Sequence, residues 1–106
     1  MAFKIELPED SLKELCKKWK IAELSFFGSV VRDDFTANSD VDILIKYLPG
    51  IRRTLLDHIR LQNELSEMLG HQVDLVNKKA IEKSPDEKRR IAILSEAQVF
   101  YLDEAA

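Results

Sequence analysis

The sequence predicts an α+β fold, a sandwich-like arrangement of one mixed β-sheet with helices packed on one main face. Short apolar segments typical of strands alternate along the chain with segments of helical periodicity, in the order α-β-α-β-α-β-α, followed by a short final strand. Roughly 20 residues of helical pattern separate the second strand from the third, which predicts that these two strands are parallel. The 106 residues are expected to form a single domain, residues 1–106, with one core.

The composition is that of an ordinary globular protein, with 45% hydrophobic and 33% charged residues. A net charge of −3 argues against a protein that coats nucleic acid, so nucleic acid is not expected as a direct partner. The single cysteine, Cys16, cannot form an internal disulfide, which fits a reducing compartment. The sequence has no hydrophobic run resembling a signal peptide or membrane span, so we expect a cytoplasmic protein without membrane contact.

The first predicted helix begins at residues 8–11, where acidic side chains favour the positive end of the helix dipole. Its apolar side chains form one stripe with helical spacing: Leu12, Leu15, Cys16 and Trp19. Cys16 is interpreted as a core residue, because a free cysteine on such a stripe is usually buried. Residues 22–27 form the first strand, which ends at Gly28-Ser29, and residues 30–35 are predicted to form a short helix.

A polar loop, residues 36–39, leads to the second strand at residues 40–47. Residues 51–69 form the longest predicted helix, and Gly70 follows where a left-handed C-cap is needed. His58 lies on the apolar side of this helix. It could act as a general base, but a hydrogen-bonded histidine at the edge of the core is the favoured interpretation. The apolar face comprises Ile51, Leu55, Ile59, Leu61, Leu65, Met68 and Leu69.

The third strand spans residues 71–77 and is followed by a basic connection at residues 78–83. Ser84 as N-cap, with proline next and glutamate at the third helical position, predicts a helix that runs to residue 96 and buries Ile91 and Leu94. A short strand at 99–102 ends the pattern. The basic residues of this region are interpreted as a solvated face, with steering of an anionic ligand as the alternative: Lys78, Lys79, Lys83, Lys88, Arg89 and Arg90.

Acidic side chains interrupt two of the apolar strands. Asp40 and Asp42 alternate along the second strand, so they share a face about 6–7 Å apart, and Asp74 can approach them if the third strand is a neighbour. Unpaired carboxylates at such a place are costly unless a cation meets them, and Mg²⁺ prefers carboxylate oxygens. In the alternative reading, Asp40 caps a turn while the other two carboxylates pair with Lys46 or Arg32.

Each of these features is weak alone, but their combination is specific. A strand ends in Gly-Ser, ten residues follow, Asp-x-Asp opens a second strand, and a lone Asp lies within a third. In this the chain resembles the minimal nucleotidyltransferases of the DNA-polymerase-β-like superfamily over nearly its whole length. Val31 and Asp33 depart from the family pattern, which commonly has a small residue and then Arg-Gly after Gly-Ser. The resemblance rests on Gly28-Ser29, Arg32, Ser39-Asp40-Val41-Asp42 and Asp74.

The resemblance implies the nucleotidyltransferase fold and the transfer of AMP from ATP to a hydroxyl group. Two Mg²⁺ ions would be held by Asp40, Asp42 and Asp74. The phosphates of ATP would be bound by Gly28, Ser29, Arg32 and Ser39. For Arg32, a surface ion pair with Asp33 or Asp34 is an equally weighted alternative.

The resemblance also implies the acceptor. Minimal nucleotidyltransferases of this kind resemble antitoxins whose partner is a helical HEPN-domain toxin, modified on a tyrosine, so we expect a hetero-oligomer. Two alternatives stay open: neutralisation of the partner by contact alone, and transfer to a small hydroxylated molecule such as an aminoglycoside within a homodimer. Only their hydroxyl groups suggest Tyr47 and Tyr101 as acceptors.

Overall fold

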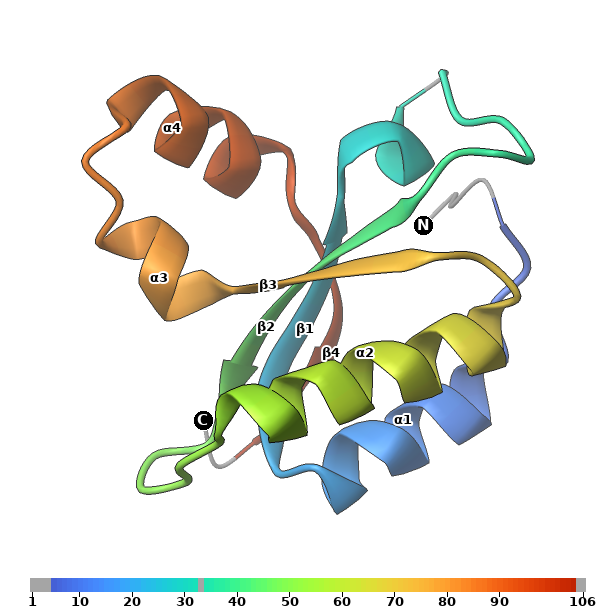
Figure 1. The fold of residues 1–106 in the computed structure, drawn as a ribbon, viewed down its shortest axis with the longest axis vertical. Helices are drawn as coiled ribbons and strands as arrows, with labels where there is room; N and C mark the ends of the chain where they lie inside the picture. Colours follow the sequence, from blue (N-terminus) through green and yellow to red (C-terminus); the bar gives the residue numbers. More distant parts are fainter. Residues whose placement is uncertain (1–4, 33, 105–106) are drawn as a thin grey trace.

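The computed structural model describes residues 5–32 and 34–104 and contains a four-stranded sheet in the order β3-β2-β1-β4 (Figure 1). Strand β2 pairs with β3 in parallel and with β1 antiparallel, and β4 pairs antiparallel with β1. The predicted mixed sheet and the parallel pair are confirmed. The elements are α1 (Glu9–Lys18), β1 (Ile21–Phe27), the 3-10 turn η1 (Gly28–Val31), β2 (Val41–Tyr47), α2 (Leu55–Leu69), β3 (Val73–Asn77), α3 (Lys78–Glu82), α4 (Glu87–Glu96) and β4 (Gln98–Leu102).

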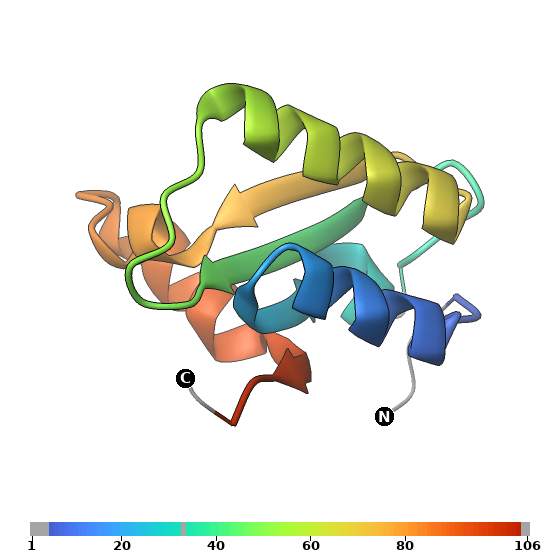
Figure 2. The same cartoon turned by 90° about the horizontal axis from the view of Figure 1, so that it is seen from below.

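The helices divide between the two faces of the sheet, whereas the sequence pattern predicted them on one main face. Helices α1 and α2 lie side by side over the face that holds the main core, which includes the fully buried Cys16 (Figures 1 and 2). Lys18 Nζ and Trp19 Nε1 both donate to Glu64 at 3.0 Å and thereby connect α1 to α2. Helices α3 and α4 contribute to a smaller cluster on the other face, formed by Phe27, Leu44, Ile81 and Ile93.

Helix α2 begins four residues later than the sequence pattern predicted. Thr54 and Asp57 form a capping box, in which each side chain accepts a 3.1 Å hydrogen bond from the backbone N–H of the other. This pair fixes the first turn, and Ile51 lies outside the helix. The predicted C-cap is confirmed, because Gly70 has a φ of 69°.

Part of the predicted apolar face of α2 is exposed to solvent. The exposed fraction is 76% for Leu55 and 44% for Ile59, and it is 36% for Ile51, which lies before the helix. At 100° per residue, Leu55 and Ile59 lie about 80° and 120° from Leu65, at the centre of the buried stripe. They therefore lie outside the buried stripe. Ile91 of α4 is likewise 56% exposed, because it lies about 200° around the helix from the buried Ile93.

Several other boundaries differ from the prediction. The basic connection contains helix α3, which Asn77 caps by accepting from Lys79 N at 2.9 Å. Helix α4 is capped by Asp86, which accepts from Arg89 N at 3.1 Å, so Ser84 is not the N-cap. The predicted helix at 30–35 is the shorter turn η1, because the backbone is extended again at Arg32.

His58 Nε2 donates to the backbone oxygen of Leu75 at 2.8 Å, which confirms a hydrogen-bonded histidine at the edge of the core. Within the described residues, none of the helices is both long and apolar enough to cross a membrane.

Candidate active site

Asp42 and Asp74 occupy matched positions in the register of the parallel strands β2 and β3. Directly paired residues point to the same face of a sheet, and this face is the one on which Leu44 and Val76 join the smaller cluster. Asp40 directly precedes β2 and is exposed. The structure therefore brings the predicted carboxylates to the same end of neighbouring strands.

The electrostatics show that these carboxylates influence one another. The pKa of Asp42 is raised to about 6, first by its partial burial, then by the charge of Asp74 and then by that of Asp40. Arg32 acts in the opposite direction but does not offset these effects. No ion pair joins Asp42 or Asp74 to Lys46 or Arg32 in the described part of the chain, so the ion-pair alternative is not realised.

The donor set fits a hard divalent cation. Over residues 5–32 and 34–104, no three acidic, histidine or cysteine side chains are already positioned as a metal site. The carboxylate oxygens are nevertheless the ligands that Mg²⁺ prefers, and a nearby cation would relieve the unfavourable charge of Asp42. Asp40, Asp42 and Asp74 are the residues that could hold such an ion.

Gly28 lies directly against the Asp42 carboxylate. Its φ is 72°, a left-handed conformation that favours glycine, and a Cβ at this position would collide with Asp42 Oδ2 and lie 3.0 Å from Cγ. The absence of a side chain therefore lets the backbone of η1 approach the Asp42 carboxylate. The Gly28 N–H donates to Glu96 Oε1 at 2.7 Å, a contact between η1 and the last residue of α4.

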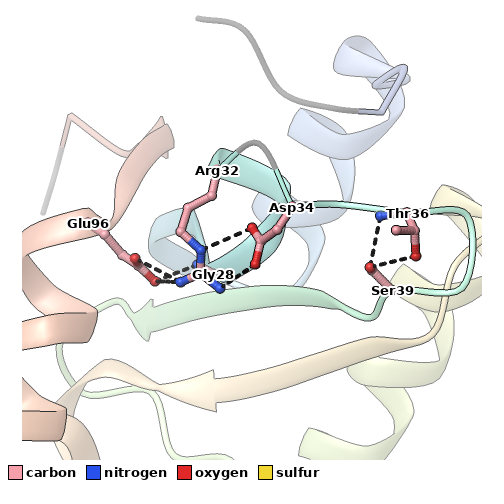
Figure 3. Close-up of polar contacts among 6 residues, drawn as sticks. All are labelled: Gly28, Arg32, Asp34, Thr36, Ser39 and Glu96. Atoms are coloured by element: carbon pink, nitrogen blue, oxygen red, sulfur yellow. Dashed lines mark hydrogen bonds and ion pairs between the residues drawn. The ribbon is translucent and has the colours of Figure 1, made fainter.

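Arg32 lies between two carboxylates (Figure 3). Its Nε and Nη2 donate to Asp34 at 3.1 and 3.3 Å, and its Nη1 donates to Glu96 Oε2 at 3.2 Å. The hydrogen bond from Arg32 lowers the pKa of Asp34. The alternative of an ion pair with Asp34 is thus confirmed, whereas Asp33 lies outside the described residues.

The two predicted serines have different surroundings. Ser29 lies within η1, and its backbone oxygen accepts from Arg32 N at 3.0 Å, which holds the turn beside Gly28. Ser39 Oγ accepts from Thr36 N at 2.9 Å and lies 3.1 Å from Thr36 Oγ1, so it closes the loop before β2. Figure 3 places this pair away from Glu96 and Gly28. The structure thus joins Ser29, but not Ser39, to the Gly28 turn.

The basic residues after β3 partly serve the fold. Lys78 Nζ pairs with Glu23 at 2.8 Å across the sheet, and Arg90 Nη1 donates to the backbone oxygen of Ser84 at 2.8 Å. These two residues are therefore not free for an anionic ligand, whereas Lys88 and Arg89 are exposed. This distribution agrees with the interpretation of the region as mainly a solvated surface.

Glu96 is the residue that sequence reasoning missed. It lies 68 positions from Gly28 along the chain, so no local motif joins the two. One signal was available: Glu96 is a carboxylate in the last turn of a helix, where the dipole disfavours negative charge, and that turn has no basic residue. An acidic residue at such a place needs a partner elsewhere.

Known proteins are similar to this chain in both sequence and fold. The family model described as a nucleotidyltransferase domain matches residues 9–100. A protein of Methanocaldococcus jannaschii, named as a candidate protein adenylyltransferase, is 45% identical over 69 residues, which cover 65% of this chain and 68% of that protein.

Solved structures agree with this relationship. A candidate minimal nucleotidyltransferase is 34% identical with a TM-score of 0.65, covering 85% of this chain and 86% of its own. The Shewanella oneidensis complex of a tri-AMPylated HEPN toxin with its MNT antitoxin contains a chain with the same fold, 18% identical, TM-score 0.61, over 91% of this chain and 71% of that one. The present chain therefore belongs to the nucleotidyltransferase domain family and is a nucleotidyltransferase with the minimal fold.

Proposed function

We propose that this nucleotidyltransferase transfers AMP from ATP to a hydroxyl of a protein partner. The observation that carries the proposal is the in-register placement of Asp42 and Asp74, with Asp42 directly against the side-chain-free backbone of Gly28. With Asp40, these carboxylates would hold two Mg²⁺ ions. The bound ions would supply Lewis-acid stabilisation to the attacking and leaving oxygens of an in-line displacement.

The surrounding residues would position the nucleotide. Attack of the acceptor hydroxyl oxygen on the α-phosphorus forms one P–O bond, the bond to pyrophosphate breaks, and the hydroxyl proton passes to solvent. The Gly28 N–H and the Arg32 guanidinium would donate to the phosphate oxygens, and Ser29 maintains the turn that presents them. Asp74 lies on β3, one of the two edge strands, and is exposed, so the acceptor hydroxyl would approach from that edge.

The proposed acceptor is a tyrosine of a helical HEPN-domain toxin, which makes this chain the antitoxin of a hetero-oligomeric pair. Support comes from the S. oneidensis complex, in which a chain of this fold accompanies an AMPylated HEPN toxin. The identity to that chain is low, so the choice of acceptor rests on the shared fold together with the candidate adenylyltransferase of M. jannaschii.

The test incubates the protein with ATP labelled on the α-phosphate, MgCl₂ and a HEPN-domain protein that binds it in a pull-down assay. We expect label on the partner with the wild-type chain, no label with Asp42→Asn, and none after the acceptor tyrosine is changed to phenylalanine. Asp10→Asn is the matched control, because it removes one carboxylate from α1 on the other face of the sheet. Equal labelling by wild type and Asp42→Asn contradicts the proposal.

Neutralisation by contact alone is the second candidate. It is favoured by the engagement of Arg32 with two carboxylates, which leaves this side chain paired in the structure. Under this mechanism Asp40→Asn and Asp74→Asn would still protect cells from the toxin, whereas transfer of AMP requires that protection is lost.

A further inference from the structure

The carboxylate of Glu96 lies where the proposed function requires a phosphate group. Its Oε1 accepts from Gly28 N at 2.7 Å, and its Oε2 accepts from Arg32 Nη1 at 3.2 Å (Figure 3). These are the donors assigned above to ATP. Resting on that function, we propose that Glu96 occupies the triphosphate subsite as an internal anion, and that nucleotide binding displaces it.

A triphosphate and Glu96 cannot use these donors together. The Gly28 N–H can donate one strong hydrogen bond, and Glu96 holds it at a distance typical of a charge-assisted bond. A phosphate oxygen in the same position would also lie next to the Glu96 carboxylate, and two anions so close repel each other. The carboxylates of Asp42 and Glu96 already act on one another, since Glu96 contributes to the raised pKa of Asp42.

The surroundings allow Glu96 to leave without dismantling the site. Its side chain is 29% exposed and lies at the end of α4, so it can rotate toward solvent. Arg32 would stay oriented, because Nε and Nη2 remain bound to Asp34 while Nη1 becomes free. Displacement therefore exposes two aligned donors, the Gly28 N–H and Arg32 Nη1. The apparent affinity for nucleotide is reduced by the fraction of molecules in which Glu96 occupies them.

The experiment measures dissociation constants by calorimetry for Mg–ATP, inorganic tripolyphosphate and AMP, without any partner protein. Glu96→Ala is expected to bind ATP and tripolyphosphate roughly tenfold more tightly than wild type, with little change for AMP, which lacks the β- and γ-phosphates. Glu96→Gln retains a hydrogen-bond acceptor for the Gly28 N–H but loses the charge. Its affinity for ATP is therefore expected to lie between those of the wild type and Glu96→Ala. Glu67→Ala removes the same charge from α2 and should match wild type.

The outcomes separate the two proposals. Unchanged or weaker ATP binding by both Glu96 variants overturns the displacement mechanism, and weaker binding would mean that Glu96 instead supports the turn. AMP transfer to the partner combined with equal ATP affinities overturns only the role of Glu96. Failure of all these proteins to bind ATP overturns the proposed function together with the inference. Glu96→Gln keeps the test valid if Glu96→Ala does not fold.

Discussion

The ionised carboxylate of Asp42 destabilises the folded protein near neutral pH. Its pKa of about 6 exceeds the value of about 3.9 expected in the unfolded chain, so the folded state binds the proton more tightly. This contribution to stability is complete below about pH 4 and is lost as the pH rises through about 6. The direction is opposite to that of Asp34, whose pKa is lowered by Arg32.

Asp42→Asn should therefore raise the free energy of unfolding at pH 7.5. The expected gain is about 1 kcal/mol, because partial exposure and solvent screening reduce the full value of the shift. The measurement is urea unfolding of wild type and Asp42→Asn at pH 4.0 and 7.5, with Glu14→Gln, which removes an exposed carboxylate from the middle of α1, as control. The difference between the two proteins should grow with pH; a difference that is independent of pH would contradict the role of Asp42.

The relative placement of the carboxylates could be predicted from sequence, whereas the contact of Glu96 with Gly28 could not, for a physical reason. Alternation along a strand fixes the face of Asp40, Asp42 and Asp74 once the strands are recognised, and the helical crossover places β3 parallel to a neighbour. The partner of the Gly28 N–H depends on how α4 packs against η1, which no local pattern specifies. The ion pair of Arg32 with Asp34 was foreseeable, because the two residues are close in sequence.

Two glycines have similar backbones but different surroundings, so they separate conformational strain from steric collision. Gly70 has a φ of 69°, and a Cβ added there would have no other atom within 4 Å. Gly28 has a φ of 72°, but a Cβ added there would collide with the Asp42 carboxylate. Gly70→Ala should cost about 1 kcal/mol through backbone strain alone, and Gly70→Asn less, because asparagine tolerates this conformation. Urea unfolding midpoints measure both, and equal losses would contradict the assignment of the cost to strain.

Gly28→Ala should cost more than Gly70→Ala, because the added methyl group must also displace the Asp42 carboxylate. The expected extra loss is about 1–3 kcal/mol, the usual range for overpacking. The displaced carboxylate should also weaken Mg–ATP binding, which Gly70→Ala should leave intact. Calorimetric titration of both variants tests this, and equal ATP affinities would show that the contact at Gly28 does not matter for the site.

At the level of the elements, the boundaries set by side-chain caps were the least predictable. Ser84 and Asp86 can both serve as N-caps, and in the structure α4 begins after Asp86. The start of α2 was likewise set by Thr54 and Asp57 and not by the apolar pattern upstream. By contrast, the existence and order of the strands followed directly from apolar segments that must be buried on at least one face.

Across the whole molecule, the main core and the candidate site lie on opposite faces of one sheet. Cys16, Leu61 and Leu65 belong to the core under α1 and α2, whereas Asp42 and Asp74 face the side of α3 and α4. The site can therefore carry unfavourable charge without disturbing the main core. Site and core remain thermodynamically coupled, because a ligand that binds only the folded state lowers the unfolded fraction.

Cys16 offers a direct measure of that coupling. Its side chain is fully buried, and burial raises the pKa of its thiol to about 12, so reaction with a thiol reagent at pH 8 requires the protein to open. We expect slow labelling by dithionitrobenzoate in buffer and immediate labelling in 8 M urea, about the strength that unfolds small domains. When the opened protein recloses faster than its thiol reacts, the rate of labelling follows the population of the open form. Mg–ATP at roughly 100 times its dissociation constant should then slow the labelling of Cys16 about hundredfold.

Without ligand, Cys16 of Asp42→Asn should be labelled even more slowly than Cys16 of the wild type, because the substitution removes a destabilising charge. Mg–ATP should slow the labelling of this variant little further, because a ligand for the cation is lost. The two effects have opposite signs, so general damage to the fold cannot produce both. Rapid labelling of native wild type would show that the core opens locally around Cys16. If Mg–ATP slowed the labelling of Cys16 equally in both proteins, the nucleotide would bind away from β2. The stability of the core would then not depend on the carboxylates on the other face of the sheet.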